Sequence, residues 1–104
     1  MVSKSTFLKS IKACITAVDS NAEVILFGSR ARGDARKDSD WDLLILTTGS
    51  VDIRMEQRFR HKLFELEIEY GQAISTRVYS KEDWVKKQSV TPLYREIKKE
   101  GVAL

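Results

Sequence analysis

Apolar residues near the start of the chain recur at steps of three and four positions. This set comprises Phe7, Leu8, Ile11, Cys14, Ile15 and Val18. Such spacing places the side chains along one stripe of a helix, so it predicts an amphipathic helix over this segment. The polar residues Asp19, Ser20 and Asn21 break the spacing, and we expect the helix to end there.

Two short, continuous apolar runs follow, at Val24–Phe27 and Leu43–Leu46. Each run is too short for a stable helix, and neither alternates with polar residues. This pattern is typical of strands that are buried on both faces. We therefore expect these runs to be the two central strands of a sheet.

The segment from about 51 to 70 returns to helical spacing among many charged residues. Its apolar positions are Ile53, Phe59, Leu63, Phe64, Leu66 and Tyr70. We predict a long helix with one apolar face, ended by Gly71, because glycine readily takes the left-handed conformation that closes a helix.

The last third of the chain predicts a strand and two short helices. Residues 73–79 have the composition of a third strand, and Ser80 to Asp83 resembles a capping box that opens a helix carrying Trp84 and Val85. Thr91-Pro92 opens a further helix, which Gly101 closes. The whole pattern predicts a single domain over residues 1–104 with an α+β fold: an α/β sandwich in which helices flank a small mixed sheet of three to four strands.

The composition excludes several classes of chemistry for this chain. The chain has 104 residues, a formal net charge of +3, one cysteine and one histidine. Cys14 and His61 alone cannot form an intramolecular disulfide or a zinc cage, and we expect both to have structural or surface roles. The small excess of basic residues suits ligands with phosphate groups. Acidic and basic residues are nevertheless too nearly balanced for a dedicated nucleic-acid binder. With no apolar segment of membrane-spanning length, we expect a cytoplasmic protein that does not enter the membrane.

The most informative segment is the polar stretch between the two apolar runs, from Gly28 to Asp42. A Gly-Ser corner directly after a strand can direct backbone N–H groups at an anion. Asp40 and Asp42 lie two positions apart at the start of the next strand, so their carboxylates project from the same face. Two hard oxygen ligands beside a phosphate site point to Mg²⁺.

Each of these features also has an ordinary structural interpretation. Gly-Ser pairs are common in turns, and acidic pairs often face solvent. The basic cluster of this stretch is either a solvated surface or a set of counter-charges for nearby aspartates; it comprises Arg30, Arg32, Arg36 and Lys37. The combination of the Gly-Ser corner with the two aspartates favours a functional site, because two carboxylates that enter a buried strand need a cation or another partner.

The residues Gly28-Ser29-Arg30-Ala31-Arg32-Gly33 followed by Ser39-Asp40-Trp41-Asp42-Leu43 resemble the signature of the minimal nucleotidyltransferases in the DNA polymerase β-like superfamily. The resemblance implies a small mixed sheet flanked by helices. It also implies transfer of a nucleoside monophosphate, most simply AMP from ATP, to a hydroxyl group with release of pyrophosphate. Asp40 and Asp42 would then be the catalytic residues and the ligands of Mg²⁺.

The resemblance also assigns roles around the nucleotide. Gly28 would allow the backbone to approach the phosphates closely. Ser29 would donate its hydroxyl and N–H groups to them, helped by the start of a short helix. Arg30, and slightly less strongly Arg32, would bind phosphate oxygens, since a guanidinium suits them. Ser39 would cap the turn that holds Asp40.

One departure from the family pattern matters. Active members supply a third carboxylate from a later strand, whereas residues 73–79 contain no acid and include Arg77. Glu67, Glu69 and Glu82 are substitutes, but none lies at the expected position.

Two main hypotheses follow. In the first, the chain is a Mg²⁺-dependent nucleotidyltransferase that modifies a partner; the resemblance implies a small helical HEPN protein, paired with this chain as toxin and antitoxin. In the second, it is a degenerate module that binds a nucleotide or a partner without turnover. A docking patch would then lie among the apolar residues Trp84, Leu93, Tyr94, Val102 and Leu104, for which local core is the simpler role. Direct nucleic-acid binding is disfavoured, since no stacking face is evident; homo-oligomerisation stays open.

Overall fold

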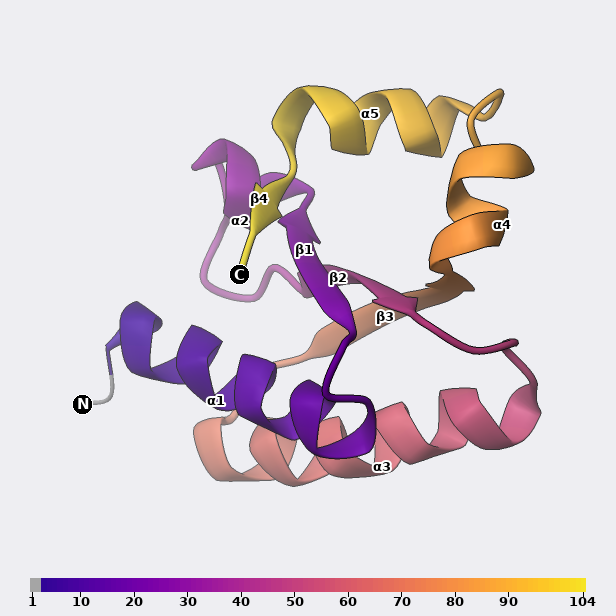
Figure 1. The fold of residues 1–104 in the computed structure, drawn as a ribbon. Coiled ribbons are helices and arrows are strands. Elements are labelled where there is room, and N and C mark those ends of the chain that lie inside the picture. Colours follow the sequence, from indigo (N-terminus) through magenta and orange to yellow (C-terminus); the bar gives the residue numbers. More distant parts are fainter. Residues whose placement is uncertain (1–2) are drawn as a thin grey trace.

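The computed structural model describes residues 3–104 as five helices, four strands and their connections (Figure 1). In chain order the elements are α1 (Lys4–Val18), β1 (Glu23–Phe27), α2 (Ser29–Arg32), β2 (Trp41–Thr47), α3 (Ile53–Tyr70), β3 (Ile74–Ser80), α4 (Lys81–Lys86), α5 (Pro92–Glu100) and β4 (Val102–Ala103). Every helix and strand predicted from the sequence is present, with ends that differ by only a few residues.

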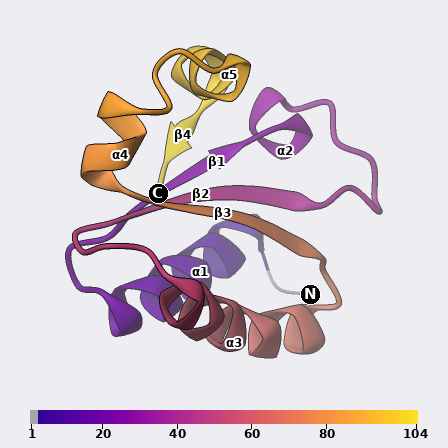
Figure 2. The same cartoon turned by 90° about the vertical axis from the view of Figure 1, so that its right-hand side faces the viewer.

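The strands form one mixed sheet in the order β3-β2-β1-β4. β1 and β2 are antiparallel, as are β1 and β4, whereas β2 and β3 are parallel. The two apolar runs are therefore the central strands, as predicted. In Figure 2, α1 and α3 cover one face of this sheet, and α4 and α5 cover the other.

Alternating residues of β2 divide the core between these two faces. Trp41, Leu43 and Ile45 pack toward α1 and α3, with Phe7 in edge-to-face contact with Trp41 at 5.0 Å between ring centroids. Leu44 and Leu46 pack toward α4 and α5, against Trp84 and Ile97 among others. Both faces are buried because helices cover both, which explains why β2 is a continuous apolar run.

The helix ends follow the predicted capping signals. Ser80 accepts a hydrogen bond from the Asp83 N–H at 3.0 Å and opens α4, and Thr91 accepts one from the Tyr94 N–H at 3.2 Å and opens α5. Gly71 closes α3 with a φ of 64°, in the left-handed region.

Two details differ from the sequence prediction. Val102 and Ala103 form a short strand on β1, because their backbone completes the antiparallel ladder there. Ile53 and Phe64 do not join the buried face of α3: they are 67% and 58% exposed, since only Phe59, Leu63 and Leu66 of that helix are buried against the sheet and α1. Trp84 is buried, and Leu93 and Tyr94 pack against the same cluster, so the simpler interpretation of these three residues as local core is confirmed.

Membrane insertion gains no support from the helices of residues 3–104, none of which is both long and apolar enough to cross a bilayer.

Candidate active site

The site begins where β1 turns into α2, at Gly28. This residue is buried and has a φ of 75°, a conformation that residues with a Cβ rarely adopt. A Cβ at Gly28 would collide with Oδ2 of Asp42. Glycine thus lets the backbone of the corner lie directly against the carboxylate of the neighbouring strand, and the sequence-predicted corner and acid are in contact.

Asp42 lies on β2 opposite Phe27 of β1, on the face that also carries Leu44. Asp40 lies just before the strand begins and is exposed, whereas Asp42 is partly buried. The expectation that both acids enter a buried strand is therefore wrong for Asp40, because the chain is still in the open loop at that position. The negative charge of Asp40 nevertheless lies close enough to raise the pKa of Asp42.

Burial raises the pKa of Asp42, and the negative charge of Asp40 raises it further. The charges of Arg32 and Arg77 act in the opposite direction, and that of Glu100 adds to the rise. The ionised form of Asp42 is therefore less favourable in the folded protein than in the unfolded chain. A bound cation would offset this cost.

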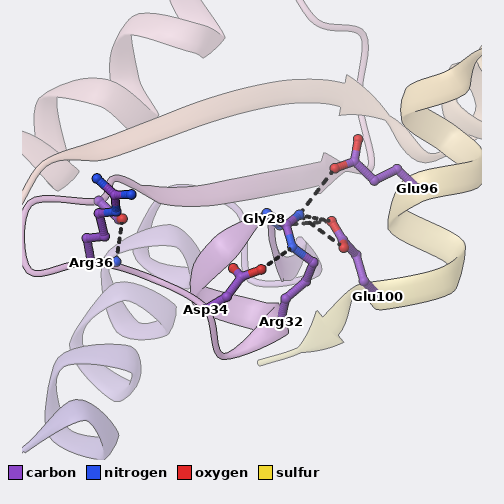
Figure 3. A network of polar contacts seen from close by, with 7 residues as sticks. Gly28, Arg32, Asp34, Arg36, Glu96 and Glu100 are labelled. Carbon is purple, nitrogen blue, oxygen red and sulfur yellow. Dashed lines mark hydrogen bonds and ion pairs between the residues drawn. The ribbon is translucent and has the colours of Figure 1, made fainter.

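Arg32 makes the densest polar network of the site (Figure 3). Its guanidinium contacts Asp34 at 3.2 Å, Glu100 at 3.2 Å and Glu96 at 3.7 Å. One Glu100 oxygen also accepts a hydrogen bond from the Gly28 N–H at 3.2 Å. The Glu100 carboxylate thus binds the Arg32 guanidinium and the Gly28 N–H. Guanidinium and backbone N–H groups of this kind commonly bind phosphate.

Glu96 and Glu100 are site residues that the sequence reasoning missed. They lie four positions apart on α5, so one helix face carries both, and the close approach of the Glu100 carboxyl group raises the pKa of Glu96. The pKa of Glu100 is lowered: its burial acts against this, but hydrogen bonds from Arg32 and Gly28 outweigh that effect. The acidic pair just before Gly101 was visible in the sequence, but its position beside Gly28 depends on β4 adding to β1.

Arg30 points elsewhere. Its guanidinium donates to the Ser39 carbonyl at 3.0 Å and the Lys37 carbonyl at 3.2 Å, and it lies 4.5 Å from the centroid of the Trp41 ring. These contacts fix the loop between α2 and β2. In this arrangement Arg30 holds the loop and Arg32 lies at the corner, whereas the slight preference for Arg30 in phosphate binding stays a prediction.

Ser39 and Ser29 have the local surroundings expected of them. The Ser39 hydroxyl accepts a hydrogen bond from the Arg36 N–H at 2.8 Å, which closes the turn before Asp40. Ser29 is the first residue of α2, and its hydroxyl makes no hydrogen bond to another group of residues 3–104. Because α2 has only four residues, individual N–H groups rather than an aligned helix dipole would attract an anion.

A third carboxylate is absent from β3, as the sequence indicated. Ser75 is level with Asp42, and Arg77 is level with Leu44. Glu67 is bound to Arg60 and to the Ile74 N–H, both at 3.1 Å. Glu82 pairs with Lys86 on α4. Glu69 lines a hollow beside Trp41, and the Trp41 side chain lies on the opposite face of the sheet from Asp42. None of the three suggested substitutes joins the site.

The site offers a divalent cation two protein ligands, Asp40 and Asp42. Across residues 3–104 no group of three or more His, Cys, Asp or Glu side chains is arranged to hold a metal ion. Asp40 and Asp42 are hard oxygen donors whose mutual repulsion a cation would relieve, and Mg²⁺ commonly takes one or two carboxylates together with substrate phosphates. The pair therefore suits a metal that arrives with a nucleotide.

Comparison with known proteins agrees with this geometry. A relative from Methanocaldococcus jannaschii with the name "Putative protein adenylyltransferase" is 36% identical over 101 residues, covering 92% of this chain and 95% of its own. A solved chain described as "Structure of putative minimal nucleotidyltransferase" superposes with a TM-score of 0.61 at 25% identity, covering 96% of this chain and 94% of that one. The model of the nucleotidyltransferase domain family matches residues 8–104. The chain belongs to the nucleotidyltransferase domain family.

Proposed function

We propose that this protein is a Mg²⁺-dependent nucleotidyltransferase that transfers AMP from ATP to a hydroxyl group of a partner protein. The observation that carries the proposal is the contact of Asp42 with the Gly28 corner. In the proposal this carboxylate would bind the metal, and the backbone beside it would bind the phosphates. Family membership and the name of the archaeal relative support the reaction class.

The residues of the chain divide the work between them. Asp40 and Asp42 would hold Mg²⁺, which supplies charge neutralisation and orientation of the triphosphate. Ser29 would donate its hydroxyl and its N–H to the terminal phosphates, and Arg32 would bind their oxygens once Glu100 releases it. Arg30 and Ser39 would hold the loop so that Asp40 keeps its position.

In the reaction the acceptor oxygen forms a bond to the α-phosphorus and the bond to the bridging oxygen breaks. Pyrophosphate leaves, and the proton of the acceptor hydroxyl passes to solvent. Since β3 offers no acid to accept this proton, the chain's contribution is positioning and charge stabilisation.

The partner that we propose is a small helical HEPN-type protein encoded beside this chain. Incubation of both proteins with Mg²⁺ and ATP labelled on its α-phosphate should label the partner. Asp40→Ala combined with Asp42→Ala should abolish labelling, while Asp38→Ala, an exposed change two positions away, should preserve it. Unchanged labelling by the double variant would exclude this mechanism.

A second candidate function is binding without turnover. The observation that favours it is Ser75 and Arg77 on the strand where active relatives place an acid. In that case the double variant would still neutralise its partner in a growth assay, whereas an enzyme would lose neutralisation together with labelling.

A further inference from the structure

β3 is an edge strand with open backbone groups. In a strand, the N–H and C=O of one residue point to one side and those of the next residue to the other. The Ala73 carbonyl accepts from Trp41 of β2, whereas the Ile74 N–H and C=O point outward to Glu67 and Arg60 of α3. The outward set therefore continues at Thr76 and Val78, which make no backbone hydrogen bond beyond the sheet within residues 3–104.

A groove of about 610 Å³ follows this edge. It runs along residues 74–79 and is also lined by Asp40, Glu56 and Arg60. The groove thus joins the open backbone groups of β3 to one of the two acids of the candidate active site.

Two residues of β3 point toward the same sheet face as Asp42. Ser75, level with Asp42, is small and exposed, so it leaves space between that acid and the sheet edge. Arg77, two residues further on, is exposed and forms no salt bridge in the part of the chain that the structure describes. A strand added at this edge would place successive side chains of one face beside Ser75 and Arg77, about 7 Å apart along the strand.

We propose that the outer edge of β3 binds the acceptor protein as an added strand, in which a hydroxyl side chain lies beside Ser75 and a carboxylate two residues away pairs with Arg77. The assignment of this peptide as the acceptor rests on the proposed function. The added strand would lie about two strand spacings, near 10 Å, from β2. The partner class is therefore an extended loop or terminal segment of the otherwise helical partner, with a hydroxyl residue and an acidic residue at alternate positions.

The probe for the test is a fluorescein-labelled peptide of seven residues in which glutamate alternates with valine or a central tyrosine. The control is the same peptide with lysine in place of glutamate. Full-length protein should bind the acidic peptide, and binding should slow hydrogen exchange of the Thr76 and Val78 amides. Equal binding of both peptides, or binding without protection of these amides, would overturn the proposal.

Matched variants locate the contact. Thr76→Pro removes one outward N–H without touching the β2 ladder and should weaken peptide binding roughly tenfold, whereas Thr76→Val keeps the N–H and should bind normally. Arg77→Ala should weaken binding of the acidic peptide, and Arg54→Ala, on the far side of α3 from this groove, should not.

Calorimetry with Mg·ATP on the same variants separates the two proposals. Unchanged nucleotide binding by Thr76→Pro with loss of peptide binding supports the edge site. If Thr76→Pro does not fold, Arg77→Ala and the amide exchange of the wild-type protein decide. Absence of nucleotide binding in the wild type would refute the proposed function and leave the peptide result standing alone.

Discussion

At the two ends of β2 the fold holds two aspartates in opposite ways. Asp19 receives hydrogen bonds from the Thr47 hydroxyl at 2.6 Å, the Thr48 N–H at 3.0 Å and the Thr48 hydroxyl at 3.1 Å. These bonds lower its pKa to about 2, with the Thr47 hydroxyl as the largest cause. At the other end Asp42 has a raised pKa, because it is partly buried beside the like charges of Asp40 and Glu100.

This difference separates a structural carboxylate from one that is available to a ligand. Asp19 joins the loop after α1 to the loop after β2, and its charge is balanced by protein donors. Asp42 is placed against Gly28 at an energetic cost that the protein alone does not offset. The residue type is the same in the two cases, so the donors and charges around each acid decide its role.

The largest expected effect comes from removing the close approach that Asp42 needs. Gly28→Ala should lower the affinity for Mg·ATP at least about 100-fold, because the new Cβ displaces the Asp42 carboxylate. Gly33→Ala is the matched control: its φ is also positive, at 84°, but no atom lies within 4 Å of its Cβ position. That variant should lose only about 1 kcal/mol of stability. Titration calorimetry measures both affinities, and equal affinity would contradict the assigned contact.

The second prediction tests the structural aspartate. Asp19→Ala should lower the free energy of unfolding by about 2 kcal/mol at neutral pH, since it leaves the Thr47 and Thr48 donors without their acceptor. Because folding lowers the pKa of Asp19 from 3.8 to about 2, its contribution is complete above pH 3.8 and is lost as the pH falls toward 2. Denaturant melts of wild type and variant should therefore converge at low pH.

Asp38→Ala is the control for this change, because Asp38 is exposed and makes no salt bridge within residues 3–104. A gap between wild type and Asp19→Ala that persists unchanged at pH 2 would show that the hydrogen bonds to the ionised carboxylate are not its cause.

The third prediction is an increase in the free energy of unfolding rather than a decrease. Asp42→Asn should raise the free energy of unfolding by about 1 kcal/mol at pH 7, because it removes a partly buried charge that lies beside other negative groups. Since folding raises the pKa of Asp42, the wild type carries this penalty above the raised pKa and loses it as the pH falls. Thermal melts at pH 7 and pH 4 check both points, and a destabilised variant at pH 7 would show that Asp42 is satisfied within the fold.

The smallest expected effect concerns the carboxylate that occupies the corner. Glu100→Gln should increase the affinity for Mg·ATP about threefold to tenfold, because it removes a negative charge from Arg32 and the Gly28 N–H. Glu23→Gln, at the exposed start of β1, is the control. Weaker binding by Glu100→Gln would mean that Glu100 instead holds Arg32 in the position that phosphate requires.

The sequence allowed most of the fold and the centre of the site to be predicted, because local signals specify them. Apolar spacing located α1 and α3, and the two apolar runs located β1 and β2. Gly28, Asp40 and Asp42 were recognisable as candidates because they lie within one segment of 15 residues that resembles a family signature. The long-range contacts could not be predicted.

Two examples illustrate this limit. Glu100 reaches Gly28 across 72 residues of sequence, and β4, whose two residues carry no recognisable strand pattern, holds it there. Arg30 and Arg32 have the same chemistry and neighbouring positions, yet the helical turn between them sends one to Trp41 and the other to Glu100. Only the three-dimensional path of the chain distinguishes them.

The central claim is that Asp40 and Asp42 hold a magnesium-loaded triphosphate against the Gly28 corner. Its most direct test is titration calorimetry of Mg·ATP into the wild type and into the Asp40→Asn, Asp42→Asn double variant, with thermal melts to confirm that both are folded. We predict saturable heat for the wild type and none for the variant. Equal binding by the two proteins, or no binding by the folded wild type, would contradict the claim.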